Sequence, residues 1–464
     1  MAVFSLILST IFSIGLSKRY NEYTHTSVDK DGIEITTILE ANEPTICDPA
    51  VKQYSGYLKA GGTNNEYFYW FFESRKDPSN DPFIMWLTGG PGCSSQLALL
   101  AENGPCQVIE NGRDTKLNPY SWNTESNIMW VDQPPGTGFS TGKDVTTETE
   151  ISQDMWAFLQ NFITTYPQYF KNGFYVIGES YGGHYVPNVM NYIWKQNNAG
   201  AGTMIPLKGF GIGNGLTDPY IQFEYYATMA YNSSTAVNSP YSGIPISKAL
   251  FNTMTSRIPK CQSEIEACNE KGDNNDCDNA YNTCMENEVS PVTATGVNPY
   301  NLDIKCAVPG LCYDFSSQTT WLNNKTVQSQ IGVDMTWESC NTLVNIRLEA
   351  DWMKDYQQLI TDPIQTNVRA LIYAGDLDFI CNWLGNQAWS LALPWKGQSQ
   401  FNTTMPVAWN VNNKQAGTIR QAKGLTNLTF VRVFDAGHMV PMDQPQSALA
   451  LVNAFITDTL APSS

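Results

Sequence analysis

A serine stands between two glycines in the stretch FYVIGESYGGHYVP, where Ser180 is the centre of a G-x-S-x-G pattern. In this pattern the glycines permit a sharp turn from a strand into a helix, which lifts the serine side chain clear of the sheet. The apolar run before Ser180 ends at Gly178, and helical periodicity begins soon afterwards. This context predicts that Ser180 is a nucleophile for acyl transfer, although the pattern alone also arises by chance.

The base that activates such a serine is nearly always a histidine, because a serine hydroxyl is a poor nucleophile at its own pKa. The chain has three histidines. His25 lies in the amino-terminal tail, and His184 lies one helical turn beyond Ser180, a poor position for accepting the hydroxyl proton. His438 lies in RVFDAGHMVPMDQP, between a predicted strand and the last predicted helix. We therefore predict that His438 is the general base and that His184 has a packing role.

The carboxylate that orients the histidine should follow a strand and lie between the serine and the histidine in the chain. The stretch LIYAGDLDFICNW places Asp376 and Asp378 directly after a predicted strand. These residues by themselves do not decide between the two aspartates, and Asp435 is a weaker third candidate.

Backbone donors for a developing oxyanion are expected in WLTGGPGCSS, where a strand breaks into glycines. A backbone free of side chains at Gly89, Gly90 and Gly92 could present N–H groups to the negative charge. The usual second donor is the backbone N–H of the residue after the nucleophile, here Tyr181. A plain glycine-rich turn is the alternative interpretation of this stretch.

The elements that must position these residues are predicted from short apolar runs bounded by glycine, proline or asparagine. Six such runs predict buried strands, over residues 83–88, 127–131, 174–178, 207–213, 368–375 and 428–434. Apolar residues recur at helical spacing over 151–163, 186–194 and 449–456. Alternating strands and helices indicate an α/β fold whose mostly parallel sheet is flanked by helices on both faces. An antiparallel hairpin formed by QYSGYLKA and EYFYWFFES is expected before it.

The alternation stops from about residue 218 to 338, which predicts a disulfide-rich, cap-like insertion over the sheet. This segment is rich in Asn, Ser, Asp and Pro and holds six of the 11 cysteines. Four of them are separated by six, eight and six residues, without the close pairs that zinc sites favour. We therefore predict nested disulfides rather than a metal site, with Cys261 bound to Cys284 around Cys268 bound to Cys277.

Composition and the amino terminus indicate a globular protein of the secretory pathway. At 464 residues and 42% apolar composition, the chain can bury one large core. The apolar run from Ala2 to Leu16 predicts a signal peptide over residues 1–17, with a buried strand or helix as the alternative, and leaves 18–464 as a single domain. No second apolar run is long enough to predict a membrane span. The net charge of −17 argues against nucleic acid and anionic membranes as partners.

Acceptor sequences for N-glycosylation and the many cysteines also favour the secretory pathway. The acceptors are Asn232, Asn324, Asn402 and Asn427. An odd number of cysteines leaves at least one thiol unpaired. A lysosomal, vacuolar or extracellular location is expected.

Beyond the individual residues, the order of the motifs resembles that of serine carboxypeptidases from about Cys47 to the carboxyl end. The motifs are WLTGGPGCSS, VDQPPGTGFS, GESYGGHYVP, GIGNGLTDP, AGDLDFICNWLGN and VFDAGHMVPMDQP. The resemblance implies an α/β-hydrolase fold with Ser180 as nucleophile, His438 as base and Asp378 as the orienting carboxylate. It also assigns the oxyanion N–H groups to Gly90 and Tyr181, and it implies no cofactor and no metal.

The resemblance further implies how the terminal carboxylate of a peptide is bound, through Trp86, Gly89, Glu102 and Glu179. Two ionised glutamates would repel a carboxylate, so at least one must hold a proton and donate a hydrogen bond. We therefore expect tighter peptide binding at acidic pH. At Thr88 this chain departs from the family, which usually has asparagine there; a threonine hydroxyl on a shorter arm predicts a weaker or water-bridged contact.

Family positions also suggest the leaving-group pocket and the remaining disulfides. Cys381, the expected free thiol, and Met439 match pocket residues whose apolar character predicts a preference for hydrophobic carboxyl-terminal residues. Cys93 with Cys340 and Cys306 with Cys312 resemble family disulfides, and Cys47 with Cys106 follows by elimination.

The function expected from this resemblance is hydrolysis of the last peptide bond of peptides and proteins, through an acyl-enzyme on Ser180. An acyltransferase on the same scaffold is one alternative. A protective or scaffolding protein of the lysosome, with incidental peptidase activity, is another. A homodimer is possible.

Overall fold

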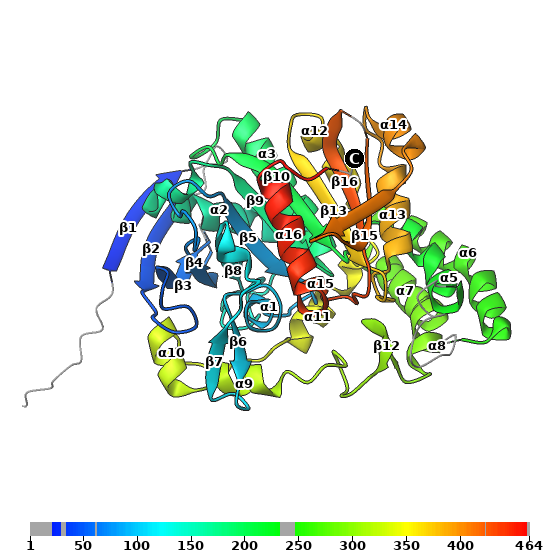
Figure 1. Ribbon diagram of the computed structural model, residues 1–464, viewed down its shortest axis with the longest axis horizontal. Coiled ribbons are helices and arrows are strands. Elements are labelled where there is room, and N and C mark those ends of the chain that lie inside the picture. Colours follow the sequence, from blue (N-terminus) through cyan, green and yellow to red (C-terminus); the bar gives the residue numbers. More distant parts are fainter. Residues whose placement is uncertain (1–20, 29–33, 61–62, 233–245, 423, 462–464) are drawn as a thin grey trace, which may run out of the picture.

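Twelve strands form one mixed sheet through the centre of the molecule, in the order β1-β2-β3-β4-β8-β5-β9-β10-β13-β16-β15-β14 (Figure 1). The computed structural model describes residues 21–28, 34–60, 63–232, 246–422 and 424–461. The strands of this sheet are β1 (Asn21–Val28), β2 (Glu34–Asn42), β3 (Gln53–Lys59), β4 (Glu66–Phe72), β5 (Phe83–Thr88), β8 (Asn127–Val131), β9 (Phe174–Glu179), β10 (Leu207–Gly213), β13 (Arg369–Gly375), β14 (Val407–Val411), β15 (Lys414–Ala422) and β16 (Leu425–Val433).

The central strands β8, β5, β9, β10, β13 and β16 run parallel to one another. Every residue of β5, β8 and β9 is buried. Because helices cover both faces of a parallel sheet, its strands are continuous apolar runs in the sequence. All six apolar runs identified in the sequence form these strands.

The outer strands are antiparallel, so the sheet is mixed rather than mostly parallel. The predicted hairpin is present as β3 and β4, which pair antiparallel, and β4 pairs antiparallel with β8. The pairs β1–β2 and β14–β15 extend the two edges and were not predicted. Their sequences, such as EITTILEAN and KQAGTIRQA, mix polar and apolar residues and lack the apolar run that marks a buried strand.

Two helical layers cover the sheet and complete its two hydrophobic cores. On one face lie α2 (Glu148–Thr165) and α3 (Gly182–Asn198), which bury apolar side chains such as Met155 and Val186. On the other face lie α1 (Ser95–Ala101) and α16 (Pro445–Ile456), which bury Leu97 and Leu451. Figure 1 shows α16 lying across the sheet. The chain therefore alternates between strand and covering helix as its periodicity predicted.

The segment between β10 and β13, residues 214–368, is here called the cap. None of its described residues joins the central sheet (Figure 1). The cap carries its own hydrophobic core, and it continues past residue 338, the end expected from the sequence. The elements around this core are α4 (Pro219–Gln222), α5 (Tyr226–Asn232), α6 (Lys248–Lys271), α7 (Asn274–Cys284), α8 (Ser290–Thr293), β11 (Val297–Asn298) and β12 (Asn301–Lys305). The later helices pack against the two cores of the sheet: α9 (Ser316–Leu322) and α10 (Lys325–Ile331) against the core that contains Leu97, and α11 (Thr342–Arg347) and α12 (Gln358–Ile364) against the core that contains Met155.

Five disulfides staple the fold, and they are the pairs expected from the sequence. Two of them join α6 to α7 inside the cap, and one joins the loop after β5 to the segment before α11. The pairs are Cys47–Cys106, Cys93–Cys340, Cys261–Cys284, Cys268–Cys277 and Cys306–Cys312. Cys381 is a buried free cysteine.

The structure describes only some of the predicted glycosylation sites and does not describe the predicted signal peptide. The expected signal peptide, residues 1–17, lies outside the described residues, as does the side chain of Asn232. Asn324 and Asn402 are exposed. Asn427 is half-buried, and its amide donates a hydrogen bond to the carbonyl of Ile364 at 2.6 Å. Among the described helices, none is long and apolar enough to cross a membrane.

Candidate active site

Ser180 occupies the tight turn between β9 and α3, with a backbone φ of +64°. This left-handed conformation is uncommon for residues other than glycine and costs free energy, so it is found mainly where function requires it. Glycines on either side let the turn approach β5. A Cβ at Gly178 would lie 2.6 Å from the carbonyl oxygen of Leu87, and one at Gly182 would lie 3.1 Å from it. The turn thus raises Ser180 out of the sheet, as the pattern predicted.

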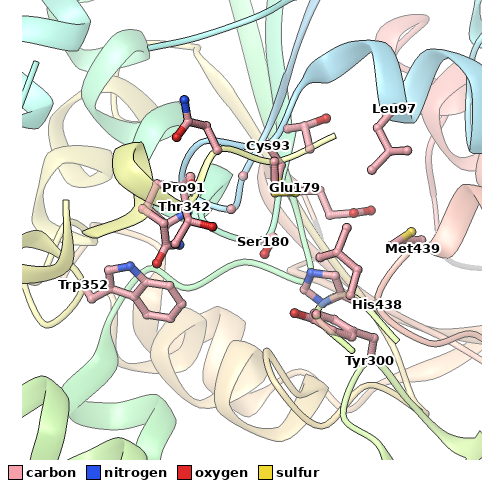
Figure 2. A pocket seen from close by; sticks show the side chains of 18 of the residues that line it. Pro91, Cys93, Leu97, Glu179, Ser180, Tyr300, Thr342, Trp352, His438 and Met439 are labelled. Atoms are coloured by element: carbon pink, nitrogen blue, oxygen red, sulfur yellow. Dashed lines mark hydrogen bonds between the residues drawn. A yellow bond between two sulfur atoms is a disulfide. The ribbon is translucent and has the colours of Figure 1, made fainter. Parts of the chain in front are cut away.

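Ser180 and His438 line the same cavity, which has a volume of about 320 Å³ (Figure 2). His438 lies on the loop after β16, and its backbone N–H donates to the carbonyl oxygen of Tyr300 at 2.7 Å. Its Nδ1 lies 2.8 Å from Oδ2 of Asp378, and both side chains are buried. With Nδ1 held by the carboxylate, Nε2 is the nitrogen left to exchange a proton with a substrate or nucleophile.

Asp378 is held by several donors besides the histidine. Its Oδ2 also accepts from Nδ2 of Asn214 at 2.8 Å and from the backbone N–H of Cys381 at 3.2 Å. Its Oδ1 accepts from the backbone N–H of Ile380 at 3.1 Å. This network fixes the carboxylate in a single orientation beside the imidazole. Asn214, in the motif GIGNGLTDP, was not predicted as a site residue. Its side chain links the end of β10 to Asp378.

The other aspartates are used elsewhere. Asp376 forms an ion pair with Arg432 at 2.9 Å, and it accepts the backbone N–H of Asp435 at 3.0 Å. Of the three candidates, Asp378 alone is hydrogen-bonded to His438 within the described chain. The structure therefore separates two aspartates that the sequence left equivalent.

His184 is fully buried behind the turn, in the packing role that the sequence predicted. Its Nδ1 lies 2.6 Å from the carbonyl oxygen of Leu216, and its Nε2 lies 3.2 Å from that of Asp351. Both ring nitrogens thus face backbone carbonyls, and because burial lowers the pKa of His184, its neutral ring donates to one of the two. The side chain of His25 lies outside the part of the chain that the structure describes.

The glycine-rich loop after β5 lies directly against the serine turn. A Cβ at Gly89 would lie 2.4 Å from the backbone nitrogen of Tyr181, so only glycine permits this approach. Gly90 has a φ of +116°, which also favours glycine. Neither the N–H of Gly90 nor that of Tyr181 donates to an acceptor within the described ranges. Two unpaired donors next to Ser180 form an arrangement suited to an oxyanion.

Two buried glutamates, Glu102 and Glu179, lie at the wall of the same cavity and share a hydrogen bond. Burial raises the pKa of Glu102 to about 7, although the hydrogen bond from Glu179 opposes this shift. Burial, followed by the negative charge of Glu102, raises the pKa of Glu179 well above its ordinary value. One carboxyl oxygen of each glutamate has no hydrogen-bond partner among the described side chains and backbone. The pair therefore holds a proton at mildly acidic pH and retains polar atoms for a ligand.

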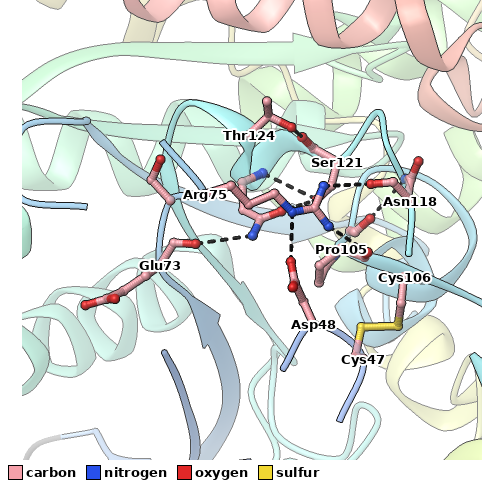
Figure 3. Close-up of polar contacts among 12 residues, drawn as sticks. Cys47, Asp48, Glu73, Arg75, Pro105, Cys106, Asn118, Ser121 and Thr124 are labelled. Atoms are coloured by element: carbon pink, nitrogen blue, oxygen red, sulfur yellow. Dashed lines mark hydrogen bonds and ion pairs between the residues drawn. A yellow bond between two sulfur atoms is a disulfide. The ribbon is translucent and has the colours of Figure 1, made fainter. Parts of the chain in front are cut away.

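The segment that follows Glu102 is anchored by a half-buried arginine, Arg75 (Figure 3). Arg75 forms an ion pair with Asp48 at 2.8 Å, and the disulfide next to Asp48 fixes the strand that follows α1. The guanidinium also donates to two backbone carbonyls of this region, those of Pro105 at 3.0 Å and Asn118 at 2.7 Å. Glu102 is thus part of a rigid segment, which keeps it beside Glu179.

Trp86 and Thr88 differ from the arrangement expected of them. Trp86 is fully buried and is not among the residues that line the cavity, whereas Thr88 lines it. The indole N–H of Trp86 donates to the hydroxyl oxygen of Thr88 at 2.8 Å. Trp86 therefore acts on the cavity through Thr88, whose hydroxyl proton remains available for a further hydrogen bond.

The cap supplies cavity walls that the sequence did not identify. Tyr300 lies edge-on to His438, with ring centroids 5.2 Å apart, and Leu311 also lines the cavity. Tyr281 and Trp352 line the cavity as well. No periodicity marks these positions, because the cap folds by packing of separate segments rather than by a repeated strand and helix.

Of the two residues expected in the leaving-group pocket, one lines the cavity and the other does not. Met439 lines the cavity, near Leu97 from the sheet side. Cys381 is not among the lining residues; its thiol is buried in the core of the cap, and burial raises its pKa well above the ordinary value. Its contribution to the site is the backbone N–H that donates to Asp378.

Comparisons with known proteins agree with this geometry. The sequence model of the family described as serine carboxypeptidase matches residues 44–458. The chain is 41% identical to carboxypeptidase Y homolog A of Trichophyton rubrum over 419 residues, which cover 88% of this chain and 76% of that protein. It is also 41% identical to carboxypeptidase Y of Komagataella phaffii over 411 residues, with the same coverage. The crystal structure of Kex1, a prohormone-processing carboxypeptidase from Saccharomyces cerevisiae, has the same fold, with a TM-score of 0.77 and 24% identity over 90% of this chain and 94% of that one.

Proposed function

The chain belongs to the serine carboxypeptidase family and is a serine-type carboxypeptidase with an α/β-hydrolase fold, and we propose that Ser180, His438 and Asp378 are its catalytic triad. The hydrogen bond of 2.8 Å between His438 and Asp378 supports this assignment. The strained turn at Ser180 and its position in the same cavity support it as well.

In the proposed reaction, Oγ of Ser180 attacks the carbonyl carbon of the last peptide bond. Nε2 of His438 accepts the hydroxyl proton and then donates it to the leaving amine, so that the terminal amino acid departs and an ester remains on Ser180. His438 next removes a proton from water, which hydrolyses the ester and restores the serine. Asp378 holds the imidazole in the required tautomer throughout.

The N–H groups of Gly90 and Tyr181 are the proposed donors to the tetrahedral oxyanion. Both lack an acceptor in the described part of the chain, and the close approach at Gly89 brings the two segments together. Such preorganised donors stabilise the negative charge more than water can, because they need no reorientation during the reaction.

The observation that carries an exopeptidase function is the buried pair of Glu102 and Glu179 at the wall of the nucleophile's cavity. We assign the substrate's terminal carboxylate to this pair, with further donors from Thr88 and the backbone of Gly89. A protonated carboxyl group can donate to the carboxylate, whereas two ionised ones would repel it. Peptide binding is therefore proposed to be tightest at acidic pH.

The leaving amino acid is proposed to occupy the space beside Leu97, Tyr300, Leu311 and Met439. All four side chains line the cavity, and Figure 2 shows Leu97, Tyr300 and Met439 on the same side of Ser180 as His438. Apart from the glutamate pair and the catalytic His438, the described side chains that line the cavity are uncharged, so hydrophobic terminal residues are the proposed preference.

The proposed location is the secretory pathway, either a lysosome or vacuole or the extracellular space, with residues 1–17 as a signal peptide. Five disulfides in the described chain favour an oxidising compartment. The exposed Asn324 and Asn402 are the proposed glycosylation sites with the freest access.

The function is tested with blocked dipeptides of varied last residue, each with a free or an amidated carboxyl terminus, at pH 5. We expect release of the terminal residue from the free acids, fastest for Leu and Phe, and much slower reaction of the amides. The Ser180→Ala variant should release nothing. Transfer of the acyl group to an added alcohol, without release into water, would favour an acyltransferase.

A further inference from the structure

The side chain of Tyr181 points away from the cavity and is tied to the cap. It is 1% exposed, and its hydroxyl donates to Oδ2 of Asp351 at 2.8 Å. Its ring stacks on His184, with centroids 4.5 Å apart and planes at 29°. Tyr181, whose backbone N–H is free beside Ser180, is therefore held in place by the hydrogen bond of its side-chain hydroxyl.

Asp351 is a buried acceptor with several partners. Its carboxylate also accepts from the hydroxyl of Tyr356 at 2.7 Å and forms an ion pair with Lys354 at 3.1 Å. Its backbone carbonyl lies 3.2 Å from Nε2 of His184, in the first turns of α3. Its side chain and its backbone thus both hold the helix that begins at the nucleophile.

The next residue in the chain, Trp352, lines the substrate cavity (Figure 2). Its ring lies against that of Tyr181, with centroids 5.7 Å apart, and against that of Tyr281 in α7, with centroids 5.4 Å apart. The segment that clamps the nucleophile's helix is therefore continuous with a wall that belongs to the cap.

We propose that Asp351 is a positioning residue, which sets the backbone N–H of Tyr181 at the distance that the oxyanion requires and ties it to the cap wall at Trp352. This inference rests on the proposed function, because it assigns Tyr181 to the oxyanion site. An oxyanion donor works only when it lies about 2.7–3.1 Å from the developing charge. Without the bond to Asp351, the first turn of α3 is free to shift, and the donor loses its alignment in the transition state.

Two phenylalanine variants separate this role from ordinary packing. Tyr181→Phe removes the hydroxyl that links Asp351 to the turn, while Tyr356→Phe removes an equivalent hydroxyl from the same carboxylate without touching the turn. We expect Tyr181→Phe to lower kcat about tenfold, with KM for a blocked dipeptide changed less than about twofold. We expect Tyr356→Phe to leave kcat within about twofold of the wild type, although both variants lower the melting temperature.

A peptide aldehyde gives a second measurement that does not depend on the fraction of folded protein. It forms a hemiacetal with the serine whose oxygen occupies the oxyanion site, so its inhibition constant reports on the donors. We expect this constant to rise about tenfold in Tyr181→Phe and in Asp351→Asn, and to stay unchanged in Tyr356→Phe.

Equal kcat values and equal aldehyde affinities in Tyr181→Phe and Tyr356→Phe would overturn the positioning role. That result differs from a failure of the proposed function, which would appear as a wild-type protein that releases no amino acid from any blocked dipeptide.

Discussion

The site is built from two regions of different character, the carboxyl edge of the sheet and the cap. Ser180, Asp378 and His438 follow β9, β13 and β16, which run parallel, so their carboxyl ends meet at one edge. Tyr300 and Trp352 come from the cap, which is held by disulfides and side-chain packing. Strand register places the reacting groups with little freedom, whereas the cap walls depend on contacts between segments far apart in the chain. The groups at the sheet edge should therefore set the rate, supported by the contact of Asp351 with Tyr181, whereas the cap walls should set the choice of substrate.

The largest expected effect concerns the two aspartates at the end of β13. Asp378→Asn should lower kcat about 10⁴-fold, because an asparagine no longer selects the imidazole tautomer. Asp376→Asn is the matched control, because Asp376 lies only two positions before Asp378 in the chain. This variant breaks the ion pair with Arg432 and leaves His438 untouched. Its kcat should stay within about threefold of the wild type, with a lower melting temperature. Similar kcat losses in both variants would contradict the assignment of Asp378.

The next effect is the pH dependence of KM, which arises from the glutamate pair at the sheet side of the cavity. Burial raises the pKa of Glu102 to about 7, so Glu102 is neutral below that pH and gains a negative charge, which repels the substrate's carboxylate, as the pH rises through it. KM for a blocked dipeptide should rise about tenfold between pH 6 and pH 8. In Glu102→Gln, which cannot ionise and whose amide donates at every pH, the rise should be smaller. A wild-type KM that is flat over this range would count against the pair as the carboxylate site.

The cap is tested by shortening one of its walls. Leu311→Ala should lower kcat/KM about tenfold for dipeptides ending in Leu or Phe and hardly at all for those ending in Ala, because a lost apolar contact costs about 1–3 kcal/mol. Leu343→Ala is the control, as Leu343 is exposed on α11 and does not line the cavity. A uniform loss over all terminal residues would show that Leu311 supports the fold rather than the specificity.

The smallest effect is expected at Thr88. An asparagine there could accept from the indole of Trp86 through Oδ1 and donate to the substrate carboxylate through Nδ2, so Thr88→Asn should lower KM by about threefold. Thr88→Val removes both the acceptor and the donor and should raise KM. If KM is the same in all three proteins, Thr88 does not contact the carboxylate.

The sheet edge could be predicted from the sequence because its signals are local. Buried parallel strands are apolar runs, and the reacting residues follow them directly, so the residues alone predict Ser180 and His438. Asp376 and Asp378 could not be distinguished in this way, since both follow the same strand. Arg432, which pairs with Asp376, lies on the neighbouring strand, and only the register of β13 with β16 brings the two together.

The cap walls could not be predicted by the same reasoning. Tyr300 and Trp352 stand in segments without periodicity, and their positions follow from the packing of helices around a separate core. The resemblance suggested Cys381 as a pocket residue, yet its thiol is buried and its backbone supports Asp378 instead. Asp351 carried no sequence signal at all, because its partners Tyr181 and Tyr356 meet it only in the folded chain.

The most direct test of the site is covalent labelling of the protein with a serine-directed organophosphate, followed by peptide mapping and an assay of amino acid release at pH 5. We expect one label per chain, located on Ser180 in the peptide containing GESYGG, and loss of peptidase activity in proportion to labelling. The Ser180→Ala variant should take up no label. Full peptidase activity in a protein labelled at Ser180, or unchanged release of amino acid by Ser180→Ala, would contradict the assignment of Ser180 as the nucleophile.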